Sequence, residues 1–167
     1  MTGEYTLPLP RSKVWSALND PELLQRCIPG CETFEKLSDT EFSAVTQLAI
    51  GPVKARFKGK IRLEDLNPPD SYTIVGQGEG GIAGFAKGNA LVFLIDFADG
   101  TKLTYRAQAQ IGGKIAQLGQ RLIAGTTRKI ADLFFFFANF VAALTQKQEM
   151  AAREGIADDR LSVPSGN

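Results

Sequence analysis

The chain contains no histidine, and its only cysteines are Cys27 and Cys31, in the segment CIPGC. The missing imidazole excludes Ser-His-Asp and Cys-His catalysis and removes the commonest metal ligand. Two cysteines alone do not complete a four-ligand zinc or iron–sulfur site. We therefore expect no metal and no covalently held cofactor, and the residues favour a binding protein over an enzyme.

Targeting segments and long apolar runs are also missing. No basic segment followed by an apolar stretch opens the chain, so we expect no signal peptide and a cytoplasmic location, with reduced cysteines buried in a tight turn. The most apolar stretch, 130–144, contains Asp132 and Asn139 and is shorter than the roughly 20 residues of a spanning helix. A net charge of +1 on 167 residues implies neither nucleic acid nor an acidic substrate.

What the chain does contain is a series of segments in which apolar and polar residues alternate. In residues 53–63 the side chains of one face are apolar or glycine, and those of the other face are Lys54, Arg56, Lys58, Lys60 and Arg62. Such alternation is typical of antiparallel strands with one wet face. Turn signals separate six predicted strands after a short opening one; the six cover residues 31–37, 41–50, 53–66, 71–78, 89–97 and 102–111.

Helical patterns occur at both ends of this series. Two short helices are predicted after the opening strand, over 12–20 and 20–28, with Ser12 and Asp20 as N-caps and Trp15 in the core. After Gly113 a helical pattern continues to about Gln148. This order predicts an α+β fold in which a curved antiparallel sheet of about seven strands surrounds one long C-terminal helix. Residues 1–148 form the predicted domain, and residues 149–167 a polar, flexible tail.

Four stretches of the chain form a recognisable set: VWSALNDPELLQRCIPGCETFEKLSDTEF, IGPVKARFKGKIRLEDLNPP, GQGEGGIAGFAKGNA and GGKIAQLGQRLIAGTTRKIADLFFFF. They resemble the CoxG family of carbon monoxide dehydrogenase proteins, which belongs to the START-like, helix-grip (SRPBCC) superfamily. The resemblance implies a non-catalytic accessory protein of an aerobic molybdenum-containing carbon monoxide dehydrogenase or a related molybdenum hydroxylase. It also implies recruitment of that enzyme to the inner face of the cytoplasmic membrane, and a quinone or lipid held in the helix-grip cavity.

A cavity between sheet and long helix would be lined by side chains that face both. The predicted lining residues are Phe57, Phe85, Phe93, Tyr105, Gly119, Leu122, Thr126, Ile130 and Phe137. Tyr105 would offer its hydroxyl to a quinone carbonyl. The segment 76–88 satisfies G-x-G-x-x-G but leads into a strand rather than a helix, so we interpret it as a mobile loop bearing Phe85 and not as a nucleotide site.

Two features suggest a surface for a membrane or a partner protein. The basic residues Lys54, Arg56, Lys58 and Lys60 repel one another on one strand face unless neighbours compensate their charge. On a helical wheel Phe135 and Phe136 fall outside the apolar stripe, which predicts that they meet a membrane or partner. Two alternatives stay open: a recruitment adaptor that binds no ligand, and an enzyme acting on an apolar substrate.

Overall fold

The computed structural model describes residues 1–161, apart from the side chains of 137, 138, 140–149 and 156–161. Its elements follow the predicted order of one strand, two short helices, six strands and a long helix. They are β1 (Thr2–Leu7), α1 (Arg11–Leu18), α2 (Pro21–Cys27), β2 (Cys31–Lys36), β3 (Glu41–Ile50), β4 (Val53–Asn67), β5 (Ser71–Glu79), the 3-10 helix η1 (Gly81–Ala83), β6 (Phe85–Phe97), β7 (Gly100–Gly112), the 3-10 helix η2 (Lys114–Leu118) and α3 (Gln120–Leu161).

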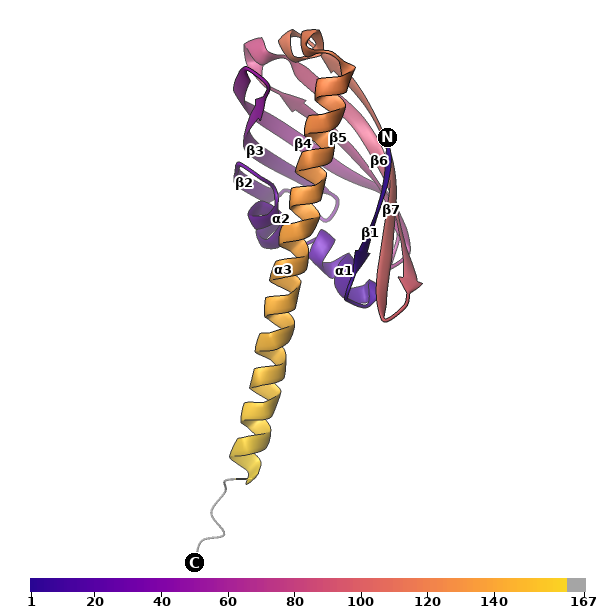
Figure 1. The fold of residues 1–167 in the computed structure, drawn as a ribbon, viewed down its shortest axis with the longest axis vertical. Coiled ribbons are helices and arrows are strands. Elements are labelled where there is room, and N and C mark those ends of the chain that lie inside the picture. The colour runs from indigo at the N-terminus through magenta and orange to yellow at the C-terminus, as the bar shows by residue number, and fades with distance from the viewer. Residues whose placement is uncertain (162–167) are drawn as a thin grey trace, which may run out of the picture.

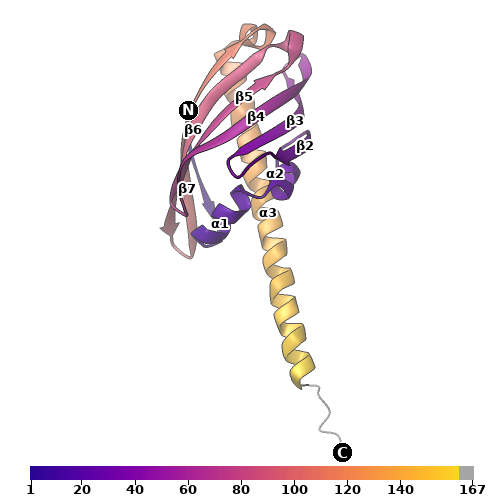
Figure 2. The same ribbon diagram turned by 180° about the vertical axis from the view of Figure 1, so that it is seen from behind.

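The seven strands form one curved, unclosed antiparallel sheet in the order β1-β7-β6-β5-β4-β3-β2. Helix α3 crosses the concave face of this sheet, and α1 and α2 lie at one end of the same face (Figure 1). Within residues 1–161, no helix lies on the opposite, outer face of the sheet (Figure 2). The α+β helix-grip architecture predicted from the sequence is thereby confirmed.

Most element boundaries follow from local residue chemistry. The side chain of Asp20 accepts a hydrogen bond from the backbone N–H of Glu22 at 3.1 Å, and Pro21 occupies the first turn of α2, as predicted. The N-cap of α1 is Pro10, two residues before the predicted Ser12, and the helix begins at Arg11.

The glycine-rich segment 76–88 is much less of a loop than predicted. Its first residues complete β5 and its last ones open β6, which leaves only 80–84 as the turn. Gly81 and Gly84 have φ values of 62° and 115°, a conformation that favours glycine. The glycines within the strands are paired in register across β5 and β6, so the ladder overrides their low strand propensity.

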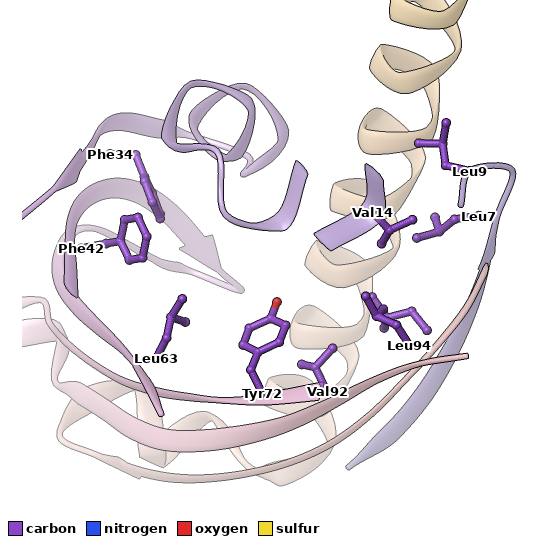
Figure 3. Packing of buried hydrophobic residues seen from close by; sticks show 10 residues of the cluster. Leu7, Leu9, Val14, Phe34, Phe42, Leu63, Tyr72, Val92 and Leu94 are labelled. Atoms are coloured by element: carbon purple, nitrogen blue, oxygen red, sulfur yellow. The ribbon is translucent and has the colours of Figure 1, made fainter. Parts of the chain in front are cut away.

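The buried side chains form two separate clusters on the concave face. The first, here called the helix cluster, lies beneath α1 and α2 (Figure 3). It consists of Leu7, Leu9, Val14, Phe34, Phe42, Leu63, Tyr72, Val92, Leu94 and Leu103. The second, here called the turn cluster, joins η1, η2 and the start of β4 through Val53, Ala83 and Ile115. The two clusters hold opposite ends of the sheet's concave face.

Helix α3 is longer than predicted, since it continues from Gln148 to Leu161. The residues concerned are rich in alanine, glutamate and arginine, which favour a helix even without an apolar stripe. A helix thus occupies 149–161, where the sequence predicted a tail, and residues 162–167 lie outside the described residues. The domain division at 148 and the flexibility of the tail stay predictions.

The predicted position of Phe135 is also wrong. Its ring stacks on Tyr5 of β1 with centroids 4.0 Å apart, and it packs against the helix cluster. A wheel with one sheet-facing stripe misses this, because α3 passes between α2 and β1 and buries a wider arc of its surface (Figure 1). Phe136 is 65% exposed, and its contact with a membrane or partner stays a prediction.

This placement makes opposite predictions for two adjacent phenylalanines. Phe135→Ala should lower the free energy of unfolding by about 2 kcal/mol, because it removes a partly buried ring from the core. Phe136→Ala should change it by less than about 0.5 kcal/mol, as expected of an exposed side chain. Urea unfolding followed by the fluorescence of Trp15, the single tryptophan, measures both. Equal losses in the two variants would contradict the placement.

Candidate ligand cavity

Small residues fill the middle of the concave face, between the two clusters. We call this set the small-residue belt; it comprises Gly59 on β4, Gly76 and Gly78 on β5, Ala86, Gly88 and Ala90 on β6, and Ala107 and Ala109 on β7. Strand register brings them together, since Gly59 pairs with Gly78, Gly76 with Gly88, and Ala90 with Ala107. On β4 larger residues flank the belt on both sides, because Gly59 stands between Ile61 and Phe57, which pack against different clusters.

Three belt glycines are not demanded by the backbone. A Cβ added at Gly59 would come no closer than 3.5 Å to any heavy atom, and one at Gly76 or Gly78 no closer than 3.8 Å. None of the three has a positive φ. They therefore leave space above the sheet that larger side chains would occupy. Gly88 differs, because a Cβ there would collide with the carbonyl oxygen of Gln108.

A hollow of about 340 Å³ lies over this belt on β5, β6 and β7; it is widely open to solvent, and its lining includes no residue of α3. Its lining includes Ile74, Gly76, Gly78, Ala86, Gly88 and Ala90. The volume is at the lower end of the range of small-molecule sites. Since belt residues such as Gly76 and Ala90 are only partly buried, α3 bridges the concave face without packing tightly against its middle.

Several residues predicted to line the cavity do face the interior. Thr126 and Ile130 lie on the partly buried side of α3. Phe57 points inward from β4, and its ring covers Gly80 and packs against the turn cluster. Tyr105 points inward from β7 with its ring over Gly3 of β1, at the edge toward the helix cluster. Their contact with a ligand stays a prediction.

Other predicted lining residues lie elsewhere. Phe85 and Phe93 project from the outer face of β6, where they are 42% and 46% exposed, because Val92 and Leu94 set the alternation of that strand inward. Gly119 precedes α3 with a φ of 91°, so it serves the backbone at the helix entry rather than the cavity. Leu122 is 39% exposed and lies against Gly51 in the β3–β4 turn. The side chain of Phe137 lies outside the described residues.

The predicted basic residues all lie exposed or partly exposed on the outer face of β4, and neighbours compensate some of them. Arg56 Nη2 is 3.0 Å from Glu32 Oε1, and Arg62 Nη2 is 2.6 Å from Glu64 Oε1. Within the part of the chain that the structure describes, Lys54, Lys58 and Lys60 form no salt bridge. Lys58 pairs in register with Glu79 of β5, whereas the cross-strand partners of Lys54 and Lys60 are uncharged.

Polar groups occur at one edge of the interior, between β1 and α3. The Tyr5 hydroxyl donates a hydrogen bond to Asp132 Oδ1 at 2.8 Å. Burial, this hydrogen bond and the neighbouring Tyr105 all raise the pKa of Tyr5 above its ordinary value near 10. The Tyr5 and Tyr105 rings are 6.2 Å apart. The edge thus offers hydroxyl groups beside an apolar space.

Tyr72 is a residue that the sequence interpretation missed. It is 4% exposed, packs edge-on against Trp15, and directs its hydroxyl away from the sheet into the interior (Figure 3). Burial raises its pKa. No hydrogen bond to this hydroxyl is present among the described residues. The belt itself was also missed. Its signal in the sequence was that Gly76 and Gly78 are two residues apart, which places both on the same face of a strand.

The remaining features concern metals, thiols and membranes. Cys27 and Cys31 are free thiols, as predicted, and burial raises the pKa of both. Among residues with described side chains, no group of three or more histidine, cysteine, aspartate or glutamate residues is arranged to hold a metal ion. No described helix is both long and apolar enough to cross a membrane.

Comparisons with known proteins agree with this geometry. The chain matches the model of the carbon monoxide dehydrogenase CoxG family over residues 3–144. A solved conserved protein from Geobacillus kaustophilus is similar at 33% identity and TM-score 0.81, covering 86% of this chain and 95% of that one. Protein Ms6760 from Mycobacterium smegmatis shares the fold at 13% identity and TM-score 0.65, covering 86% and 90%. TTHA0849 from Thermus thermophilus shares the fold at 15% identity and TM-score 0.63, and the match covers 86% of this chain and 97% of that one. No curated protein matches the chain.

The buried tyrosines predict how stability depends on pH. Because the folded state holds the Tyr72 and Tyr5 protons more tightly than the unfolded state, their contribution is fully present below pH 10 and is lost as pH rises above it. We expect the unfolding free energy to fall above pH 10, at up to about 1.4 kcal/mol per pH unit for Tyr72 and less for the more exposed Tyr5. Urea unfolding between pH 8 and roughly 11 should show a smaller fall in Tyr72→Phe, and an unchanged fall would show that this proton is not held.

Proposed function

Because the chain belongs to the carbon monoxide dehydrogenase CoxG family, we propose that it is a non-catalytic accessory protein of such a dehydrogenase, or of a related molybdenum hydroxylase, that binds an apolar molecule. The observation that carries this proposal is the small-residue belt. Its glycines Gly59, Gly76 and Gly78 are needed neither for backbone conformation nor for close packing, and they leave a space lined by apolar atoms. An apolar ligand in this space would bury apolar surface of the sheet that no side chain covers, and this burial is favourable.

The proposed ligand is a quinone or another lipid. Its apolar part would lie over Gly76, Gly78 and Ala90, beneath Thr126 and Ile130 of α3. Its polar end would meet the edge at which Tyr105 lies beside the Tyr5–Asp132 hydrogen bond. A quinone would supply the electron-accepting chemistry, and the chain would supply shape, exclusion of water and position.

Recruitment to a membrane follows from the same proposal, because a lipid-soluble ligand must be collected at a lipid surface. Lys54, Lys58 and Lys60 support this, since they project from one outer strand face and form no salt bridge with the described residues. Each basic group near an anionic surface contributes about 1 kcal/mol. A recruitment adaptor with the same lysines and an empty cavity is the alternative, which ligand binding decides.

Filling the belt should abolish ligand binding without unfolding the protein. Gly76→Leu places a side chain in the proposed ligand space, and its Cβ meets only an ordinary contact 3.8 Å from the Lys60 carbonyl oxygen. We expect at least a tenfold loss of affinity for a short-chain quinone analogue and for a fluorescent fatty acid, measured by saturation of fluorescence. Purified wild-type protein should also release an apolar molecule into organic solvent, identified by mass spectrometry.

The matched control is Gln77→Leu, which adds the same side chain to the next residue of β5 but on the outer face. It should bind both probes as wild type does. Equal binding by Gly76→Leu and Gln77→Leu, with both folded, would overturn the cavity proposal. Wild-type protein that binds neither probe and releases no apolar molecule would favour the adaptor.

Reversal of the free lysines tests membrane contact separately. The triple variant Lys54→Glu, Lys58→Glu and Lys60→Glu should lose most of its binding to vesicles with 30% anionic lipid, about tenfold or more, in co-sedimentation assays. Reversal of Arg121, Arg128 and Lys129 on α3 is a control with the same charge change. Similar binding by wild type and the β4 variant would contradict membrane contact through β4.

A further inference from the structure

The outer face of β6 carries a row of large apolar side chains. Leu91, Phe93, Ile95 and Phe97 occupy four successive outward positions and are 40%, 46%, 51% and 46% exposed. We call these four residues the β6 strip. In register, the strip is flanked by Ser71 and Thr73 of β5 on one side, and by Lys102, Thr104 and Arg106 of β7 on the other.

This strip departs from the pattern expected of an antiparallel sheet. The outer face of such a sheet is ordinarily polar when it meets water. Here no described helix covers it (Figure 2). The strip lies on an interior strand of the sheet, but β5 pairs with β6 only as far as Phe93, so Ile95 and Phe97 have β7 alone beside them. Contiguous exposed apolar residues of this kind mark interaction sites. The proposed ligand space lies on the other face of the sheet and does not explain them.

We propose that the β6 strip is the centre of an interface with a second copy of this chain. The two sheets stack face to face, related by a two-fold axis that runs across the strands at the level of Leu94. The two β6 strands then run antiparallel, so that Phe93 of one copy lies over Ile95 of the other and Leu91 lies over Phe97. Aligned stacking of two sheets in this way is a common mode of packing in β proteins.

The charges beside the strip are complementary under this symmetry. Arg106 lies level with Leu91, and Asp99 lies in the turn just beyond Phe97. The two-fold axis brings Arg106 of each copy over the end of the strip where Asp99 of the other copy lies. Glu4 and Lys102, which are 3.5 Å apart within one copy, also approach their counterparts reciprocally. Opposite charges therefore meet at both ends of the strip.

The charge of the whole chain also favours a second copy over an anionic surface. A net charge of +1 means little repulsion between two copies. Lys102 is engaged with Glu4 and lies 5.0 Å from the centre of the Phe97 ring, so it is less available to lipid headgroups. An acidic partner would find a denser positive charge on β4, two strands away.

The size of the strip sets the expected strength. Four side chains of about 200 Å² each, slightly less than half exposed, offer on the order of 350 Å² of apolar surface. A stable interface buries roughly 800 Å² on each partner, so the polar rows on β5 and β7 must contribute the rest. We therefore expect a dimer that dissociates at micromolar concentrations rather than a permanent one.

Sedimentation equilibrium of the full chain from about 1 to 500 μM in 0.15 M salt tests the proposal. Wild type should shift from monomer to dimer, and Ile95→Lys should raise the dissociation constant at least thirtyfold. Phe85→Lys is the matched control, because Phe85 is 42% exposed on the same face of β6 but lies outside the strip. It should dimerise as wild type does.

A charge exchange tests the orientation of the two copies. Arg106→Asp and Asp99→Arg should each weaken the dimer, and the double variant should recover most of the loss. Wild type that remains monomeric at 500 μM, or a dimer that Ile95→Lys leaves intact, would overturn the proposal. Ile95→Lys should retain quinone-analogue binding, so failure of the interface and failure of the ligand site are distinguishable.

Discussion

The structure depends on how α3 is supported across the concave face of the sheet. At one end the helix is held beside α2 and β1, where Phe135 stacks on Tyr5. At the other end η2 anchors it through Ile115, packed with Val53 and Ala83. Between these supports the sheet presents glycine and alanine, and no large side chain of the belt reaches up to the helix. A helix fixed at both ends of a curved sheet cannot collapse onto its middle, so the space there is retained at a cost in packing.

Strand periodicity determines which side chains enter this space. Because the side-chain period of a strand is two, one inward residue fixes the orientation of all the others until a bulge intervenes. Val92 and Leu94 point into the helix cluster, which directs Ala90, Gly88 and Ala86 toward the cavity and sends Phe93 and Phe85 outward. The placement of Phe57 could be predicted because lysine and arginine mark the outer face of β4, whereas residues 90–95 are apolar on both faces and do not show which way Phe93 points.

Much of the fold could be predicted from the sequence, because alternation, capping and turn residues all agreed. The bounds of β3 match the prediction, and Asp20 caps α2 as its position suggests. The candidate site was harder, since a pattern of small residues does not reveal whether a facing helix fills the gap. The helical wheel gave the wrong position for Phe135 for a similar reason. Phe135 is buried by Tyr5, a residue 130 positions away in sequence, and a local pattern cannot predict that contact. In the glycine-rich segment the low strand propensity of glycine predicted a loop, but pairing with the neighbouring strands makes most of the segment part of the sheet.

Strand β6 unites the two faces of the molecule. Its inward positions near the cavity are alanine and glycine, whereas four of its outward positions carry leucine, isoleucine or phenylalanine. This reverses the usual distribution, in which a strand buries its large residues and exposes its small or polar ones. In a sheet stabilised only by its own core this distribution lowers stability, because apolar side chains are exposed to water on one face and space is left unfilled on the other. Both costs disappear together when an apolar molecule occupies the inner face and an apolar surface covers the outer one. The unusual composition of β6 therefore supports both proposals, the ligand site on its inner face and the interface on its outer face.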